Sequence, residues 1–482
     1  MNLWILTEEK PKISTLWGIL ELYCRDFGGK ILSDCNTAKI KPLIKDRRFL
    51  FTYEFENVSV EGIDNIFIKT VSGKSSFFDF LLFRQVEPPE EGCMKNLLMA
   101  IEETKTSDSE SRNTGVSQRG SKFVYIKAFA PQAKLYMFYN DELNEQQERT
   151  PSATSVFGTN ILLTLGVDIV GKDTEGRFRP FTSVEEMIAF KSAMRRPPKN
   201  NVPIDITMDG DTIYVSGRLD KPQGAGNIGH DPSIGALSMI SACLRKLGWR
   251  GDIVITLHGV SQEYADRNSS NKFFYIAQML GVRLEGITMN SEAKLPKQYW
   301  RYEMRSEKVA SILLHIVAEY SGMREVYQNH AGCERGYFRT QDGDLITLPK
   351  ERLVTFLYEK KRKKKGGYKV KNGITYENLL LPDLILCDLK TKSIILIEGK
   401  QLQNQAYGLE EIENYYGIKE DYINKYYSDF DLTVGLSLFG GRISSTSQLS
   451  GKVILYLDGS GKIYLNNNSA KCIIDAFNRF SA

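Results

Sequence analysis

Histidine and paired cysteines are scarce in this chain. The 482 residues include four histidines and seven cysteines, and no two cysteines form a Cys-x-x-Cys pair. Few histidines argue against a histidine-rich metal centre, and isolated cysteines argue against a zinc ribbon and against a disulfide framework. We therefore expect a protein of a reducing compartment and predict a cytoplasmic location.

Long apolar runs are also missing. No run approaches the roughly 20 residues of a membrane-spanning helix, and the first ten residues lack the basic start and long apolar core of a signal peptide. The sequence therefore predicts no membrane association. It also shows no internal repeat and no signature of a methyltransferase.

A nucleotide-dependent enzyme is disfavoured because the sequence has no Walker lysine motif. Gly224, Gly226 and Gly229 match the GxGxxG pattern literally, but residues 220–222 separate the first glycine from the preceding predicted strand. We therefore favour a loop at this position. A turn whose amides meet a DNA phosphate at a helix N-terminus is the alternative.

Overall charge does not indicate a nucleic-acid partner, because the net charge is only +4. Positive charge is concentrated instead in the six consecutive cations of residues 360–365. Phosphate neutralisation is one role for such a run, and the predicted DNA contacts within it are Lys361, Arg362, Lys363 and Lys364. A solvated surface run is the alternative. The composition is otherwise that of a globular protein, and the length suggests two or three domains.

The most informative stretch runs from Leu379 to Lys400, where two apolar runs flank the charged, turn-rich residues 388–393. This pattern predicts a β-hairpin. Asp383 begins the first strand, and Glu398 lies 15 positions later (398 − 383), near the end of the second. Because side chains alternate along a strand, Glu398 and Lys400 share one face. Two carboxylates beside one ammonium group predict a site for a hard cation such as Mg²⁺.

Pro382-Asp383 and Glu398-Gly399-Lys400 resemble the two halves of the motif of the PD-(D/E)XK nucleases, the superfamily of most type II restriction endonucleases. The resemblance implies that Asp383 and Glu398 bind Mg²⁺ and that Lys400 positions or activates the attacking water. It also implies a mixed-sheet core flanked by helices. The competing interpretation is an ordinary hairpin with a solvated glutamate and lysine at its end.

Predicted helices on both sides of this hairpin offer further polar groups. A helix over residues 351–361 carries Glu351 and Glu359, and the resemblance implies that a helical acid can join the site. A second helix begins at about Leu409. It offers Glu410, Glu413 and Tyr416 as polar groups, with Ile412 and Tyr415 predicted to pack.

A second apolar strand, from Leu97, ends in Glu103-Thr104-Lys105, and Asp79 lies 24 positions before Glu103 (103 − 79). By the same pattern Asp79 and Glu103 are predicted metal ligands, and Lys105 is the positive side chain beside them. Phe78 stands where the motif has a proline. The polar segment that follows carries side chains of the types that read purine edges and grip phosphates. The predicted DNA contacts are Arg112, Asn113, Gln118 and Arg119. A flexible surface loop and a structural strand end are the alternatives.

The predicted fold class is mixed α+β (α/β) and multidomain, with a restriction-endonuclease-like core. We expect an N-terminal α/β, nuclease-like segment at 1–150, a middle α/β region at 151–305 and a PD-(D/E)XK nuclease domain at 306–482. Apolar runs at Phe123–Ala130 and Asn160–Val170 predict buried strands.

These patterns predict a Mg²⁺-dependent, sequence-specific endonuclease that acts on double-stranded DNA and is similar to type II restriction enzymes. Two Glu-x-Lys strands suggest two different active sites, one for each strand of an asymmetric sequence, because a single chain lacks the two-fold symmetry that reads a palindrome. In the simpler version only Asp383, Glu398 and Lys400 are catalytic. The alternatives are a DNA-binding protein with a decayed nuclease fold and a structure-specific repair nuclease. We expect a monomer or homodimer and, by resemblance, a separate cognate methyltransferase.

Overall fold

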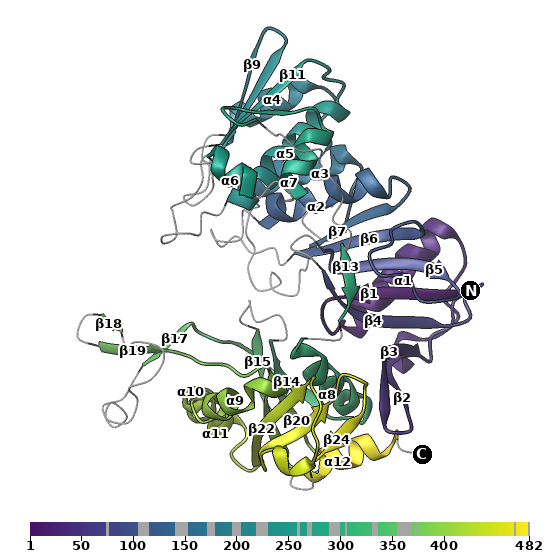
Figure 1. The fold of residues 1–482 in the computed structure, drawn as a ribbon, viewed down its shortest axis with the longest axis vertical. Coiled ribbons are helices and arrows are strands. Elements are labelled where there is room, and N and C mark those ends of the chain that lie inside the picture. The colour runs from purple at the N-terminus through teal and green to yellow at the C-terminus, as the bar shows by residue number, and fades with distance from the viewer. Residues whose placement is uncertain are drawn as a thin grey trace. The chain divides into compact units, whose positions relative to one another are not determined.

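The computed structural model shows a multidomain, mixed α+β chain with several mixed sheets (Figure 1). The chain divides into two compact units. Unit 1 comprises Met1–Leu3, Thr7–Val71 and Tyr302–Ala482, and unit 2 comprises Trp4–Leu6 and Ser72–Arg301. The three segments expected from the sequence remain a prediction. The residues that the structure describes are 1–73, 77–104, 115–139, 153–170, 179–194, 204–217, 230–257, 261–267, 272–288, 299–303, 306–329, 336–353, 369–371, 374–466 and 469–480.

Unit 1 contains the predicted hairpin and the helices around it. Its helices are α1 (Ile13–Phe27), α8 (Lys308–Tyr320), α9 (Gln405–Ile412), α10 (Tyr416–Ile418), α11 (Asn424–Tyr426) and α12 (Lys471–Asn478). Its strands include β2 (Lys39–Lys45), β3 (Arg48–Glu56), β14 (Arg324–Gln328), β15 (Tyr337–Arg339), β16 (Leu345–Thr347), β17 (Glu351–Leu353), β18 (Lys369–Lys371), β19 (Ile374–Asn378), β20 (Leu384–Asp388), β21 (Ser393–Gln401), β22 (Asp431–Phe439), β23 (Val453–Leu457) and β24 (Ile463–Leu465). Strands β1 (Asn2–Thr7), β4 (Ile66–Gly73) and β13 (Trp300–Tyr302) contribute residues to both units.

A six-stranded mixed sheet in the order β14-β20-β21-β22-β23-β24 forms the centre of unit 1. Strand β21 is antiparallel to β20 and parallel to β22, so it lies in the interior of the sheet. The apolar run of β21 is fully buried, as expected for a strand covered on both faces. The hairpin expected from the sequence is therefore confirmed.

Helices α8 and α9 cover opposite faces of this sheet. Ile394 and Leu396 of β21 belong to one core cluster with Ile412 of α9. Gly399 is on the opposite face of β21, beside Glu307 and α8. A Cβ built on Gly399 would lie 3.3 Å from the Glu307 carbonyl oxygen. The α9 face is apolar along most of β21 and becomes polar only where the strand ends.

Unit 2 contains two groups of strands and the helices packed on them. The strands are β5 (Phe80–Gln85), β6 (Leu97–Thr104), β7 (Lys134–Tyr139), β8 (Asp168–Val170), β9 (Ile204–Asp209), β10 (Thr212–Gly217), β11 (Asp252–Leu257) and β12 (Arg283–Leu284). The helices are α2 (Gly115–Phe129), α3 (Ala153–Leu165), α4 (Val184–Ala193), α5 (His230–Lys246), α6 (Gln262–Arg267) and α7 (Lys272–Met279). Strands β5, β6, β7 and β8 lie side by side in one sheet, in the order of the chain. Strands β12, β11, β10 and β9 form a separate sheet in that order. The glycine-rich segment 224–229 lies outside the described residues.

Two predicted strands are helices in the structure. Phe123–Ala130 belongs to α2 and its end, and most of Asn160–Val170 belongs to α3, with only the last three residues in β8. Helix α2 packs against β6, α3 and α5, so consecutive residues such as Tyr125 and Ile126 are both buried. A helix buried on several sides reads as a continuous apolar run, which is why its periodicity was hidden.

The helix predicted at residues 351–361 is also wrong where the structure describes it, because Glu351–Leu353 forms strand β17. This strand pairs with β19. Arg352 makes ion pairs with Glu377 of β19, and with Glu420 and Asp421, at 3.0, 3.1 and 2.7 Å respectively. Tertiary pairing therefore overrides the helical spacing of the apolar residues. Among the described residues, no helix is both long enough and apolar enough to cross a membrane.

Candidate metal-binding active site

The hairpin of β20 and β21 brings the two predicted acids together. Leu384 pairs with Ile397, so Asp383 lies opposite Glu398 one step further along the ladder. The Asp383 amide donates a hydrogen bond to Glu398 Oε2 at 3.3 Å, and the Gly399 amide donates to Asp383 Oδ2 at 2.9 Å. The backbone of the hairpin therefore fixes the position of the Asp383 carboxylate.

Lys400 is held between two carboxylates on the α9 face of β21. Its ammonium group forms an ion pair with Glu398 and a second one with Glu411 Oε2 at 2.9 Å. The side-chain stem of Lys400 packs beside Gly408 of α9, where an added Cβ would lie 2.9 Å from Lys400 Cγ. Glu398 and Lys400 are both buried, so their charges interact through protein rather than through bulk water.

Tyr415 completes the contacts of Glu398. The Tyr415 hydroxyl donates a hydrogen bond to Glu398 Oε2 at 2.6 Å. The sequence predicted only packing for Tyr415 and did not select Glu411. Helical spacing could have found Glu411, because Gly408 and Glu411 are three residues apart and lie on one side of α9. Tyr415 lies beyond the end of α9, so this spacing does not identify it.

A further acid near the site is Glu307, immediately before α8. Its charge contributes to raising the pKa of Asp383. The sequence had offered Glu351 or Glu359 as the helical acid. Glu351 is instead in strand β17, and Glu359 lies outside the described residues.

The electrostatics of the site favour a cation. Burial and the neighbouring Glu398 raise the pKa of Asp383 to about 7, although the Gly399 amide and Lys400 act in the opposite direction. Burial also raises the pKa of Glu398, and Lys400 and Tyr415 offset this only in part. Burial alone would lower the pKa of Lys400, but Glu398 and Glu411 outweigh it and raise that pKa. Three acids around one lysine leave excess negative charge, which suits a divalent cation with oxygen ligands.

Replacing Gly399 with alanine should damage the site, because the new Cβ would lie 2.9 Å from Asp383 Oδ2. Relief of this contact must move the Asp383 carboxylate away from the Gly399 amide. We expect the free energy of unfolding to fall by about 1–3 kcal/mol and the affinity for Mg²⁺ to fall at least about tenfold. Denaturant unfolding and calorimetric Mg²⁺ titration measure the two effects.

Gly459→Ala is the matched control for this substitution, because a Cβ at Gly459 meets no atom within 4 Å. It should change the free energy of unfolding by less than about 0.5 kcal/mol. Wild-type Mg²⁺ affinity in the Gly399→Ala protein would show that Asp383 is not a ligand.

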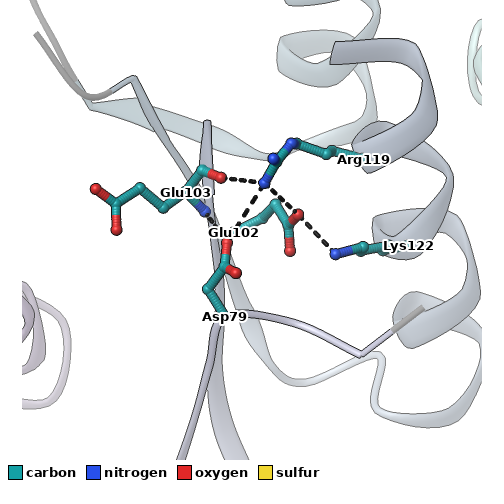
Figure 2. A network of polar contacts seen from close by, with 5 residues as sticks. All are labelled: Asp79, Glu102, Glu103, Arg119 and Lys122. Atoms are coloured by element: carbon teal, nitrogen blue, oxygen red, sulfur yellow. Dashed lines mark hydrogen bonds and ion pairs between the residues drawn. The ribbon is translucent and has the colours of Figure 1, made fainter. Parts of the chain in front are cut away.

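A second polar cluster lies beside the end of β6 in unit 2 (Figure 2). Glu102 is fully buried, and its Oε1 accepts hydrogen bonds from Arg119 Nη1 at 3.1 Å and from Lys122 Nζ at 2.6 Å. Arg119 also lies 3.7 Å from Asp79 Oδ2 and donates to the Glu103 carbonyl oxygen. Both cations come from helix α2, which follows β6 in the chain.

The structure gives Glu103 a different position from the one that the sequence suggested. Its backbone amide donates to Asp79 Oδ2 at 2.6 Å, while its carboxylate points away from the cluster in Figure 2. Glu102 has the opposite orientation on the strand and faces Arg119 and Lys122. Arg119, a predicted DNA contact, is therefore bound to acids on its own unit.

The remaining predicted site residues lie outside the described residues, apart from Gln118. Lys105, Arg112 and Asn113 lie outside the described residues, and so do Lys361, Arg362, Lys363 and Lys364. Gln118 belongs to α2, but its side chain is not among those described.

A third group of titratable residues surrounds His315 in α8. His315 is fully buried, and its Nε2 lies 3.3 Å from Glu319 and 3.1 Å from Glu325. Lys10 forms an ion pair with Glu319 at 2.7 Å. Burial acts to raise the pKa of Glu319, but His315 and Lys10 outweigh it and lower that pKa. Lys10 therefore pairs with one of the two acids around His315.

Comparison of the chain with protein-family models, with curated proteins and with solved structures gives no match. A functional assignment therefore depends on the residues described above and on their geometry.

Proposed function

We propose that the chain is a Mg²⁺-dependent DNA endonuclease whose catalytic residues are Asp383, Glu398 and Lys400. The observation that carries this proposal is the convergence of the half-buried Asp383 carboxylate and the buried Glu398 carboxylate at the end of one hairpin, with a lysine ion-paired to Glu398. Asp383 and Glu398 would hold the ion. Mg²⁺ binds through one or two carboxylates and completes its coordination with waters and phosphate oxygens.

Each residue of the site has a role that follows from its surroundings. A bound Mg²⁺ ion supplies Lewis-acid stabilisation of the attacked phosphate. Lys400 places a fixed positive charge beside that phosphate, and Glu411 keeps the ammonium group in position when Glu398 engages the ion. Tyr415 and the Asp383 amide orient the Glu398 carboxylate. These contacts hold the groups in place before the substrate arrives, which is the condition for efficient electrostatic catalysis.

The architecture of unit 1 supports a restriction-endonuclease-like core as part of the same proposal. Its mixed sheet presents the acids at the end of interior strand β21 and carries helices α8 and α9 on opposite faces.

We further propose that the substrate is double-stranded DNA, that it is cut at specific sequences, and that the enzyme is a monomer or homodimer. The cation run of residues 360–365 supports a polyanionic partner.

Cleavage of a supercoiled plasmid tests this function. Wild-type protein should convert the plasmid to discrete linear products in Mg²⁺ and leave it supercoiled in EDTA. Lys400→Met should cut about 10²-fold more slowly, because one charge that stabilises the transition state is removed. Lys390→Met, at the exposed turn of the same hairpin, should cut at the wild-type rate.

The outcomes separate the competing functions. Wild-type protein that binds DNA of varied sequence but never cuts it is the result expected of a decayed nuclease. Cleavage without discrete bands indicates recognition of structure rather than sequence. Equal rates for Lys400→Met and wild type would remove this site from the reaction. Thermal unfolding in Mg²⁺ checks that each variant is folded.

A further inference from the structure

The two units contain the same arrangement of strands around their acidic clusters. In unit 1, β20 is antiparallel to β21, and β21, β22 and β23 are successively parallel. In unit 2, β5 is antiparallel to β6, and β6, β7 and β8 are successively parallel. Helix α9 connects β21 toward β22, and helix α2 connects β6 toward β7. Each helix also packs on the strand that precedes it.

The residue pairing of the two hairpins shows which positions correspond. Phe80 pairs with Ile101, so Asp79 lies opposite Glu102, just as Asp383 lies opposite Glu398. Each aspartate directly precedes its strand, and its Oδ2 accepts the amide of the residue after that glutamate: Glu103 at 2.6 Å in unit 2 and Gly399 at 2.9 Å in unit 1. Glu102 is therefore the counterpart of Glu398, and Glu103 is the counterpart of Gly399.

The two oxygens of the Glu102 carboxylate have different surroundings. The Glu102 side chain has no exposed surface, and both of its cations bind Oε1. Its Oε2 is buried without a hydrogen-bond partner among the described residues. In unit 1 both oxygens of Glu398 are occupied, one by Lys400 and the other by Tyr415 and the Asp383 amide. A buried carboxylate oxygen without a partner is unfavourable and indicates a missing cation or proton.

Asp79 supplies the second carboxylate at this position. It is near enough that its negative charge, together with burial, raises the pKa of Glu102 to about 7. Asp79 is about one-third exposed, with a relative exposure of 37%, so the Asp79 end of the pair is open to solvent. Arg119 and Lys122 hold the buried glutamate from the opposite oxygen and leave Oε2 available.

We propose that Asp79 and Glu102 Oε2 form a second divalent-cation site, with Arg119 and Lys122 of helix α2 as its positive groups. Residue 104, which corresponds to Lys400 in the pairing, is a threonine, so the cations of this site come from the helix instead of the strand. Mg²⁺ and Mn²⁺ are the ions that suit an oxygen-only ligand set of this kind. Use of the site to cut the second DNA strand rests on the proposed function, whereas ion binding does not.

Counting bound Mn²⁺ in the absence of DNA tests the inference. Electron paramagnetic resonance of free Mn²⁺, titrated into the full chain, should show two ions bound per wild-type chain. Glu102→Gln and Asp79→Asn should each bind one ion, and the remaining ion should be lost when Glu398→Gln is added. Glu103→Gln is the matched control on the neighbouring residue and should still bind two.

Two results would overturn the inference. One is a single ion in the wild type that disappears in Glu398→Gln, which would mean that Glu102 Oε2 carries a proton. The other is loss of an ion in Glu103→Gln while Glu102→Gln keeps both. If Glu102→Gln does not fold, the partly exposed Asp79→Asn decides. Two bound ions without any DNA cleavage would refute the proposed function alone, and cleavage with one bound ion would refute this inference alone.

Discussion

Glu398→Gln should abolish Mg²⁺-dependent DNA cleavage while leaving unit 1 folded. The substitution keeps the shape of the side chain and an oxygen that can accept from Tyr415, but it removes one of the two charges that hold the ion. Loss of the stabilisation that a metal ion provides costs several kcal/mol, which corresponds to a rate reduced by about 10³ or more. Single-turnover cleavage of a plasmid measures this rate.

The Glu398→Gln protein should be folded but less stable, because its amide NH2 must face either Lys400 or the Tyr415 hydroxyl, while Lys400 keeps its ion pair with Glu411 at 2.9 Å. Thermal unfolding without metal checks this point. Glu413→Gln is the matched control: Glu413 pairs with Lys452 at 3.0 Å, and both side chains are more than half exposed. That control should cut at the wild-type rate. Rapid cleavage by Glu398→Gln would exclude Glu398 as a ligand.

The affinity for Mg²⁺ should fall about tenfold for each pH unit below 7. The pKa of Asp383 is raised to about 7 by burial and by Glu398, so the metal-free site holds a proton below this pH. An ion must displace that proton, and its apparent affinity follows the ionised fraction. Above pH 7 the affinity should become constant. Calorimetric titrations in two buffers of different ionisation enthalpy count the proton that is released.

The raised pKa of Asp383 also determines how pH changes the stability of the metal-free protein. A carboxyl group whose pKa in the folded state is above its ordinary value of 3.8 favours folding while it is protonated. That contribution is complete below pH 3.8 and is lost as the pH rises through about 7.

Lys400→Met should move the pH below which Mg²⁺ affinity falls to a higher value, because Lys400 lowers the pKa of Asp383. A flat affinity between pH 6 and 8 with no proton release would contradict this account.

Local sequence patterns were enough to predict the hairpin and the approach of Asp383 to Glu398. The turn residues and the apolar runs of β20 and β21 are contiguous in the chain, and alternation along a strand decides which side chains share a face. The partners from other elements were not predictable in this way. Glu307 reaches the site through the packing of α8 on the sheet, which no local pattern encodes.

The cluster of unit 2 shows where a motif in sequence differs from an arrangement in space. Glu103-Thr104-Lys105 has the spacing of the motif, so the sequence predicted Glu103 as the ligand. The pairing of β5 with β6 turns Glu102 toward Arg119 instead, because one step along a strand reverses the face. Strand register depends on two segments, so one segment alone could not decide between the adjacent glutamates.

The locality of the β20–β21 hairpin has a consequence for the order in which unit 1 folds. Asp383 and Glu398 are 15 positions apart (398 − 383), and hairpins of this kind close within microseconds. Parallel strand β22 follows β21 only after α9, α10 and α11, so its pairing with β21 is less local and slower to form. The two like charges therefore meet before β22 pairs with β21. Protonation or a captured cation at this early stage removes the repulsion, so the ligand that the site is proposed to use would also assist its formation.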